Sequence, residues 1–195
     1  MEKSTQISGT RRLTGMAILT AIVIVLQLLG SFIRFGPFSI SLVLVPIVIG
    51  AALYGAWAGG WLGFVFGAVV LLSGDAAAFL AVNPAGTIIT CLVKGFLAGL
   101  CAGLVYNLIN GKNETLAATA AAVVCPVVNT GVFLIGCKLF FMETISGWAA
   151  AMGFENVGTY MIVGLVGLNF LFEMLVNVIL SPVIIRLIHA ARRGR

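Results

Sequence analysis

Long apolar runs, separated by short polar or glycine-rich connections, dominate the sequence. A helix needs ~20 apolar residues to cross the hydrocarbon core of a bilayer. We expect six membrane spans, at about residues 13–31, 40–53, 61–73, 84–109, 116–141 and 160–188. The second and third runs are short for full spans, so they are expected to form a tight hairpin around residues 54–60. The pattern predicts an all-α integral membrane protein with short loops.

The composition narrows this prediction. Of the 195 residues, 61% are hydrophobic and 9% are charged, whereas a soluble domain carries about 25% charged residues. Six spans of ~20 residues use ~120 residues, which leaves too few for an added soluble domain. The chain is therefore expected to be a single membrane domain, residues 1–195. A soluble enzyme, a nucleic-acid-binding protein and a secreted disulfide scaffold are excluded.

Basic residues gather at three places in the chain. They precede the first run, lie in the hinge between the fourth and fifth runs, and follow the last run: Lys3, Arg11, Arg12, Lys112, Arg186, Arg192, Arg193 and Arg195. An even number of spans puts these three places on one side of the membrane. Because basic loops are retained in the cytoplasm, both termini are predicted to be cytoplasmic.

Motifs for metal, cofactor or nucleotide chemistry are missing from the sequence. The cysteines Cys91, Cys101, Cys125 and Cys137 lie in apolar runs without the clustered spacing of a metal site, and His189 is far from them. No phosphate-binding G-x-x-x-x-G-K-[ST] motif occurs. We therefore expect no metal, no cofactor and no ATPase or other enzymatic activity.

Glycines recur at every fourth position in two runs. The series are Gly55, Gly59, Gly63, Gly67 and Gly95, Gly99, Gly103. Small residues at this spacing let two helix backbones approach closely within a membrane. The spacing predicts helix packing inside the protein.

Ionisable residues inside the apolar runs are the main functional clue, because a charge at the bilayer centre is costly unless it is paired or hydrated. At ~1.5 Å per residue, Lys94 lies about 15 Å and Glu173 about 20 Å below the outer ends of their spans. They can therefore meet near the midplane. Lys138 lies close to the outer end of its span, where it can reach around to a cavity or extend outward.

Amide side chains accompany these charges. Asn169, Glu173 and Asn177 recur at every fourth position and form one polar stripe, and Asn129 lies in the middle of the fifth span. Lys94 and Glu173 could form a structural ion pair bridged by these amides. They could instead line a solute pocket between spans four, five and six that opens outward. Arg34, in the first outer loop, would then cap the pocket or remain a solvated loop charge.

The charges of these residues suggest a type of solute. Two or three cationic groups stand against one deep carboxylate, which favours a small solute with an anionic group and hydroxyl or amide functions.

The first span adds a more specific pattern, Ala17-Ile-Leu-Thr-Ala21. With this patch, its length, its topology and the Asn-x-x-x-Glu stripe of the last span, the whole chain resembles the substrate-binding S components of energy-coupling-factor (ECF) vitamin transporters. The resemblance implies a multi-pass protein of the prokaryotic plasma membrane. It implies that Ala17 and Ala21 dock a transmembrane coupling subunit, that two partner ATPase subunits supply energy, and that the loaded protein rotates in the bilayer to release its vitamin inside.

The resemblance also bears on the substrate. The riboflavin-type branch carries Asn followed three residues later by Lys in the last span. Here Asn169 matches the Asn but Phe172 replaces the Lys, which argues against riboflavin. Pantothenate is the leading expectation, because its carboxylate suits Lys94 or Lys138. The alternative is a stand-alone secondary transporter in which Glu173 couples transport to an ion.

Overall fold

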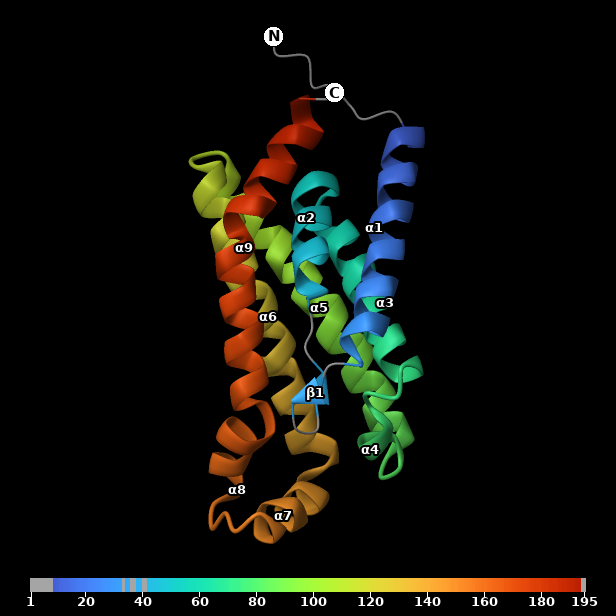
Figure 1. The fold of residues 1–195 in the computed structure, drawn as a ribbon, viewed down its shortest axis with the longest axis vertical. Coiled ribbons are helices and arrows are strands. Elements are labelled where there is room, and N and C mark those ends of the chain that lie inside the picture. The colour runs from blue at the N-terminus through green and yellow to red at the C-terminus, as the bar shows by residue number, and fades with distance from the viewer. Residues whose placement is uncertain (1–8, 33, 36–37, 40–41, 194–195) are drawn as a thin grey trace.

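The computed structural model describes residues 9–32, 34–35, 38–39 and 42–193. Within these ranges the protein is a bundle of helices with one hairpin of two-residue strands (Figure 1). The helices are α1 (Gly9–Gly30), α2 (Leu44–Tyr54), α3 (Ala56–Leu72), α4 (Ala77–Leu80), α5 (Pro84–Asn110), α6 (Glu114–Phe140), α7 (Met142–Ala151), α8 (Val157–Thr159), the π-helix η1 (Tyr160–Gly167) and α9 (Leu168–Arg193). The strands β1 (Arg34–Phe35) and β2 (Phe38–Ser39) pair antiparallel. The expected helical architecture is confirmed for the described residues, this hairpin apart.

Four of the described helices are long and apolar enough to cross a membrane. They are α1, α5, α6 and the continuous helix Val157–Ala190. Helices α2 and α3 have 11 and 17 residues and are apolar but shorter. Tyr54 and Ala56 are separated by Gly55 alone, with φ of 97°, a backbone conformation that glycine adopts readily. The short hairpin expected for the second and third runs is therefore present, and it turns at Gly55.

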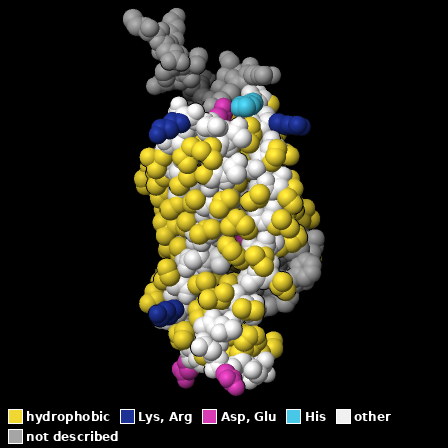
Figure 2. Space-filling model, turned by 90° about the vertical axis from the view of Figure 1, so that its left-hand side faces the viewer, with side chains coloured by type: hydrophobic (Ala, Val, Ile, Leu, Met, Phe, Trp, Pro, Cys, Tyr) yellow, Lys and Arg dark blue, Asp and Glu magenta, His cyan; other side chains and the backbone are white. Residues whose placement is uncertain are grey.

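The chain runs back and forth between two ends of the bundle. The start of α1, the hinge at residues 111–113 and the end of α9 lie together at one end, here called the terminal end (Figure 1). Strand β1 and helices α4, α7 and α8 lie at the other, the loop end. On the face shown in Figure 2, charged side chains gather at these two ends and hydrophobic side chains cover the band between them.

Helices α3 and α5 touch backbone to backbone along the two glycine series. A methyl group added at Gly63 would overlap the Gly95 carbonyl, and one at Gly59 would overlap the Gly99 carbonyl. Gly67 meets the Cys91 carbonyl in the same way. The packing predicted from the four-residue spacing therefore occurs, and it places α5 beside α3 along its length.

Helix α1 lies at the edge of the bundle, against α2 and α3. Of its most apolar 18-residue window, 11% is buried, compared with 39% for α5 and for α6. Its two buried residues are Val23 and Gln27. Most of its surface, including Ala17 and Ala21, is exposed.

Asparagine caps set the start of α5 and of α6. The side-chain oxygen of Asn83 accepts a hydrogen bond from the backbone N–H of Gly86 at 2.9 Å, next to the Pro84 predicted to begin the span. Asn113 accepts from the backbone N–H of Leu116 at 3.0 Å. Such caps satisfy N–H groups that the helix itself leaves unpaired. The caps define where α5 and α6 begin, and so they set how far along each helix its polar residues lie.

Aromatic rings fill the loop end. The ring centroid of Phe79 in α4 lies 5.6 Å from that of Phe133, 5.1 Å from that of Phe141 and 5.4 Å from that of Trp148. Trp148 belongs to α7, a helix within the stretch expected to be a loop. Helices α4 and α7 therefore pack over the end of α6.

The glycine contact between α3 and α5 allows a stability test. Gly63→Ala should lower the unfolding temperature by several degrees, because forcing a group into a tight contact costs ~1–3 kcal/mol. The temperature can be measured in detergent with a dye that reacts with thiols, since Cys91, Cys125 and Cys137 are buried.

Gly131→Ala is the matched control. It is also a helical glycine, but no neighbouring atom lies within 4 Å of an added methyl group. The better helix propensity of alanine can add up to ~1 kcal/mol to the free energy of unfolding, so the unfolding temperature should stay the same or rise. Equal effects of the two substitutions would contradict the close contact.

Candidate functional site

A cavity opens among the helices toward the loop end. Its empty volume is about 770 Å³, counting the part open to the surroundings. Residues of α1, α3, α4, α5, α6, η1 and α9 line it. Residues from helices far apart in the sequence therefore meet around one cavity.

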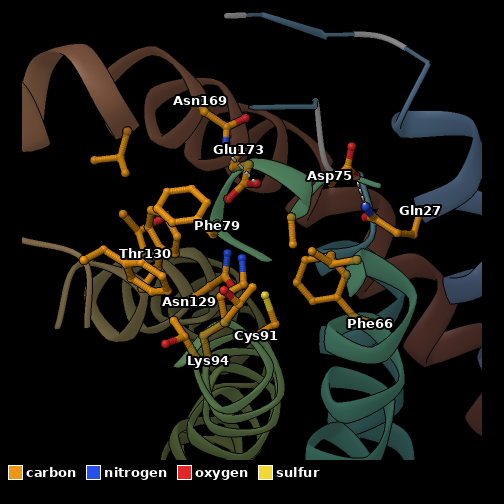
Figure 3. Close-up of a pocket in the computed structure, with 17 residues that line it drawn as sticks. Gln27, Phe66, Asp75, Phe79, Cys91, Lys94, Asn129, Thr130, Asn169 and Glu173 are labelled. Atoms are coloured by element: carbon orange, nitrogen blue, oxygen red, sulfur yellow. Dashed lines mark hydrogen bonds between the residues drawn. The ribbon is translucent and has the colours of Figure 1, made fainter. Parts of the chain in front are cut away.

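Four of the six solute-contacting residues predicted from the sequence line this cavity: Lys94, Asn129, Asn169 and Glu173. Figure 3 shows Lys94 and Asn129 entering from one side and Asn169 and Glu173 from the other. Ala17 and Ala21, which the sequence predicted to dock a partner, are exposed on α1 and are not among the lining residues. The fold thus joins polar residues of α5, α6 and α9 at one place.

A fifth predicted residue, Lys138, is not brought there. Lys138 is exposed in the last turn of α6 and is not among the lining residues. It follows Asn129 by nine residues, and at ~100° per residue this puts it about half a turn around the helix. The backbone of Arg34 lies in β1 at the loop end, while its side chain lies outside what the structure describes.

The ammonium group of Lys94 lies between two aromatic rings. Its Nζ is 5.7 Å from the centroid of Phe66 and 5.2 Å from that of Phe133. A cation over a ring face at this distance is stabilised by the ring's quadrupole. Among the described residues, no carboxylate oxygen lies within 4.0 Å of this Nζ, the distance that defines a salt bridge. The ammonium therefore remains able to pair with an anionic group in the cavity.

Two residues of the polar stripe on α9, Asn169 and Glu173, line the cavity, whereas Asn177 is buried and is not among the lining residues. Asn169 Nδ2 donates to Glu173 Oε1 at 3.2 Å, and Asn177 Nδ2 donates to the Glu173 backbone carbonyl at 2.8 Å. The Glu173 side chain is 2% exposed. Asn169 therefore contacts a deeply buried carboxyl group, while Asn177 is hydrogen-bonded to the helix backbone one turn before it.

Three buried oxygen atoms of the cavity wall have no hydrogen-bond partner in the described protein. They are Thr90 Oγ1, Asn129 Oδ1 and Glu173 Oε2. More than 90% of buried polar groups in folded proteins are hydrogen-bonded, and one left unpaired costs ~1–3 kcal/mol. Three such atoms around one cavity offer a bound molecule positions to which it could donate hydrogen bonds.

Gln27 and Asp75 also line the cavity, although they were not predicted to do so. Gln27 Nε2 donates to Asp75 Oδ2 at 2.7 Å, and Ser73 Oγ donates to the same oxygen at 3.2 Å. Figure 3 shows this pair on a third side of the cavity. A glutamine inside the first apolar run was the available signal for Gln27. Asp75 lies between the third and fourth expected spans, and the sequence does not show how the turn after α3 folds back to the cavity.

The charges around the cavity differ from the expected balance. The described lining contains one cation, Lys94, against two carboxylates, Asp75 and Glu173. The expectation of two or three cations against one carboxylate assumed that Lys138 and Arg34 contribute. Nearby, the described residues contain no group of three His, Cys, Asp or Glu side chains that could hold a metal ion.

A π-helix precedes the polar stripe. Residues Tyr160–Gly167 form η1, and the α-helix resumes at Leu168, one residue before Asn169. Short π-helical segments occur frequently at functional sites, since their wider turns change the direction in which later side chains point. Val166 of η1 lines the cavity. The sequence predicted a regular helix here, because two glycines in an apolar run do not distinguish the two forms.

Comparisons with known proteins agree with this architecture. Residues 11–185 match the family described as "ECF transporter, substrate-specific component". The chain is 28% identical to the pantothenic acid transporter PanT of Lactococcus lactis subsp. cremoris, over 92% of this chain and 94% of that protein. Its fold is similar to the solved structure of ThiT from Listeria monocytogenes, with a TM-score of 0.67 and 22% identity over 93% of this chain and 95% of that one.

The solute-free protein can show whether Glu173 is part of a structural ion pair. We expect Glu173→Gln to leave the unfolding temperature unchanged or raise it, because the carboxyl group is buried with one oxygen unpartnered. If Lys94 and Glu173 formed a buried ion pair, the loss of one partner would cost ~3–5 kcal/mol.

Glu143→Gln, at an exposed position of α7, controls for the change in net charge. The measurement is the same thermal unfolding in detergent. A drop of several degrees for Glu173→Gln alone would favour the ion pair over the solute site.

Proposed function

The chain belongs to the family of ECF transporter substrate-specific components, and we propose that it captures a vitamin outside the cell for import by the ECF complex. Members of this family are transporter subunits and not enzymes. The several apolar helices agree with a multi-pass membrane protein. The proposal rests chiefly on the cavity, where three buried oxygen atoms lack partners.

The proposed topology is one membrane domain, residues 1–195, with six spans and both termini in the cytoplasm. The helices overlap the six apolar runs, although α3 begins at Ala56, five residues before the third run. The start of α1, the α5–α6 hinge and the end of α9 share the terminal end (Figure 1), where the basic residues of the sequence also gather. This orientation directs the loop end and the mouth of the cavity outward.

Pantothenate is the proposed substrate. It has a carboxylate, an amide, two hydroxyl groups and a dimethyl-substituted carbon. Lys94 is the described cation that can pair with the carboxylate, and Asn129, Asn169 and Glu173 can exchange hydrogen bonds with the amide and hydroxyls. The rings of Phe66, Phe79 and Phe133 offer apolar surface for the methyl groups. The similarity to PanT supports the same substrate.

Arg34 and Lys138 have different proposed roles at the entrance. The β1 position of Arg34 at the loop end suits a residue that covers the cavity mouth. The exposed Lys138 acts at longer range and attracts an anionic solute to the entrance rather than contacting it inside.

Delivery is proposed to proceed through α1. Ala17 and Ala21 are exposed one helical turn apart, and small side chains at this spacing let a partner helix approach closely. We assign them to docking on the transmembrane coupling subunit, with two ATPase subunits supplying the energy. The hydrophobic band between the charged ends (Figure 2) lets the loaded protein rotate in the bilayer without moving many charges through it.

The first test compares pantothenate with pantothenol, which has an alcohol in place of the carboxylate. Wild-type protein should bind pantothenate more tightly. Lys94→Gln should weaken pantothenate binding by ~10–100-fold, because a hydrogen bond to a charged group is worth ~1.5–3 kcal/mol. Dissociation constants can be measured by calorimetry on the purified protein.

Pantothenol is the internal control for this substitution. Its affinity should change little in Lys94→Gln, since it offers no carboxylate for Lys94. Equal loss of both ligands would contradict the pairing with the carboxylate. If neither pantothenate nor any vitamin of a panel bound more tightly than millimolar, the capture role itself would fail.

The second test separates binding from delivery. Ala17→Trp should leave pantothenate affinity within about twofold and reduce uptake by the assembled transporter at least about tenfold, because a large side chain prevents close helix approach. Uptake of radiolabelled pantothenate into proteoliposomes that contain the complete complex is the measurement.

Leu175→Trp controls for added bulk on the lipid-facing surface, because Leu175 is 57% exposed on α9. Unchanged uptake with Ala17→Trp would remove the docking assignment. Proteoliposomes with this subunit alone, under a proton or sodium gradient, test the alternative. Gradient-driven uptake that disappears in Glu173→Gln would identify a stand-alone transporter.

A further inference from the structure

Helix α1 reaches the cavity through one side chain. Among the described residues of α1, Gln27 alone lines the cavity. Its side chain is 2% exposed, on a helix that is otherwise mostly exposed. Gln27 Nε2 donates to Asp75 Oδ2 at 2.7 Å, and Asp75 is itself a lining residue. A buried polar residue on the most exposed long helix therefore touches the wall of the solute site.

Between described residues, two other side-chain hydrogen bonds join α1 to its neighbours, and both are exposed and longer. Trp61 Nε1 donates to Thr20 Oγ1 at 3.3 Å, and Arg12 donates to the Tyr54 carbonyl at 3.3 Å. A hydrogen bond to a carboxylate is about twice as strong as one between neutral groups. Of these three contacts, the one between Gln27 and Asp75 is the shortest and the one made to a carboxylate, and it lies six residues after Ala21.

We propose that Gln27 is a positioning residue that couples occupancy of the cavity to the placement of α1. The proposal rests on the function proposed above. Gln27 and Ser73 hold the Asp75 carboxylate in place. A solute hydroxyl that donates to Asp75 fixes the same carboxylate and so strengthens the contact with α1. Because such coupling is reciprocal, a firmly held α1 in turn favours the occupied cavity.

The consequence concerns the two faces of α1. Gln27 points into the cavity, whereas Ala17 and Ala21 lie on the exposed surface proposed to dock the coupling subunit. A solute that steadies α1 from inside presents this surface in one orientation. Loaded and empty protein would then differ in docking even though no docking residue contacts the solute.

Hydrogen–deuterium exchange of residues 23–30, in protein reconstituted in lipid nanodiscs, tests the proposal. Without solute, Gln27→Leu should speed exchange of this segment about tenfold, the factor expected for one lost hydrogen bond to a charged group. With saturating pantothenate, the wild-type segment should exchange several-fold more slowly. This slowing should be absent in Gln27→Leu.

Thr20→Val is the matched control, since it removes the exposed hydrogen bond of the same helix and should change exchange less than about twofold. Asp75→Asn is a milder second variant. Its amide oxygen still accepts from Gln27, so a folded protein with a smaller increase in exchange is expected.

Three results would overturn the proposal. They are unchanged exchange in Gln27→Leu, equal effects of Gln27→Leu and Thr20→Val, and wild-type protein that binds pantothenate without slowing of residues 23–30. If the wild type bound no vitamin, the proposed function would fail separately. The exchange measured without solute would still show whether Gln27 holds α1.

Discussion

The backbone contact between α3 and α5 is the constraint on which the rest of the structure depends. Lipid tails are as apolar as the helix surfaces, so the hydrophobic effect does not drive these helices together, and close packing takes its place. Gly59, Gly63 and Gly67 of α3 meet Gly99, Gly95 and Cys91 of α5. With one face of α5 used in this contact, another is free to carry Thr90 and Lys94 to the cavity wall. The position of the cavity thus follows from where the glycines lie.

The cavity in turn reflects the cost of polar groups in a membrane. Helix packing alone does not explain why Asn129, Glu173 and Thr90 are present, because each buried oxygen left without a partner lowers stability. Asn169 donates a hydrogen bond to one carboxyl oxygen of Glu173, and the other carboxyl oxygen has no partner among the described residues. The unpartnered oxygens lie together, next to a lysine held between two phenylalanines. This arrangement suits a ligand that is partly polar.

The sequence predicted the parts of this site that depend on helical periodicity. Asn169 and Glu173 lie four residues apart on one helix, and Lys94 lies ten residues after the proline that begins its own, so their positions followed from counting. The position of Lys138 could also be judged from helical periodicity. Its half-turn offset from Asn129 agrees with the exposed position that it has in the structure. Gln27, Asp75 and Phe79 depend on how α1 and the turn after α3 pack. Such contacts join segments far apart in the chain, and no local pattern encodes them. The π-helix before Asn169 was missed for a different reason, since its apolar residues suit either form of helix.

The weak burial of α1 can be understood from the two tasks proposed for it. A helix that must leave part of its surface for a partner cannot bury that surface within its own bundle, and 11% burial of its apolar window agrees with this. The placement of a helix with so few buried residues would not depend on solute binding unless some contact linked the helix to the cavity. Gln27 supplies that contact, and it does so with a hydrogen bond rather than with apolar packing. Apolar contacts between helices differ little in free energy from contacts with lipid, whereas a buried amide without its acceptor is clearly disfavoured. A single polar side chain is therefore enough to make the position of α1 depend on the cavity wall, while its outer face stays available for docking.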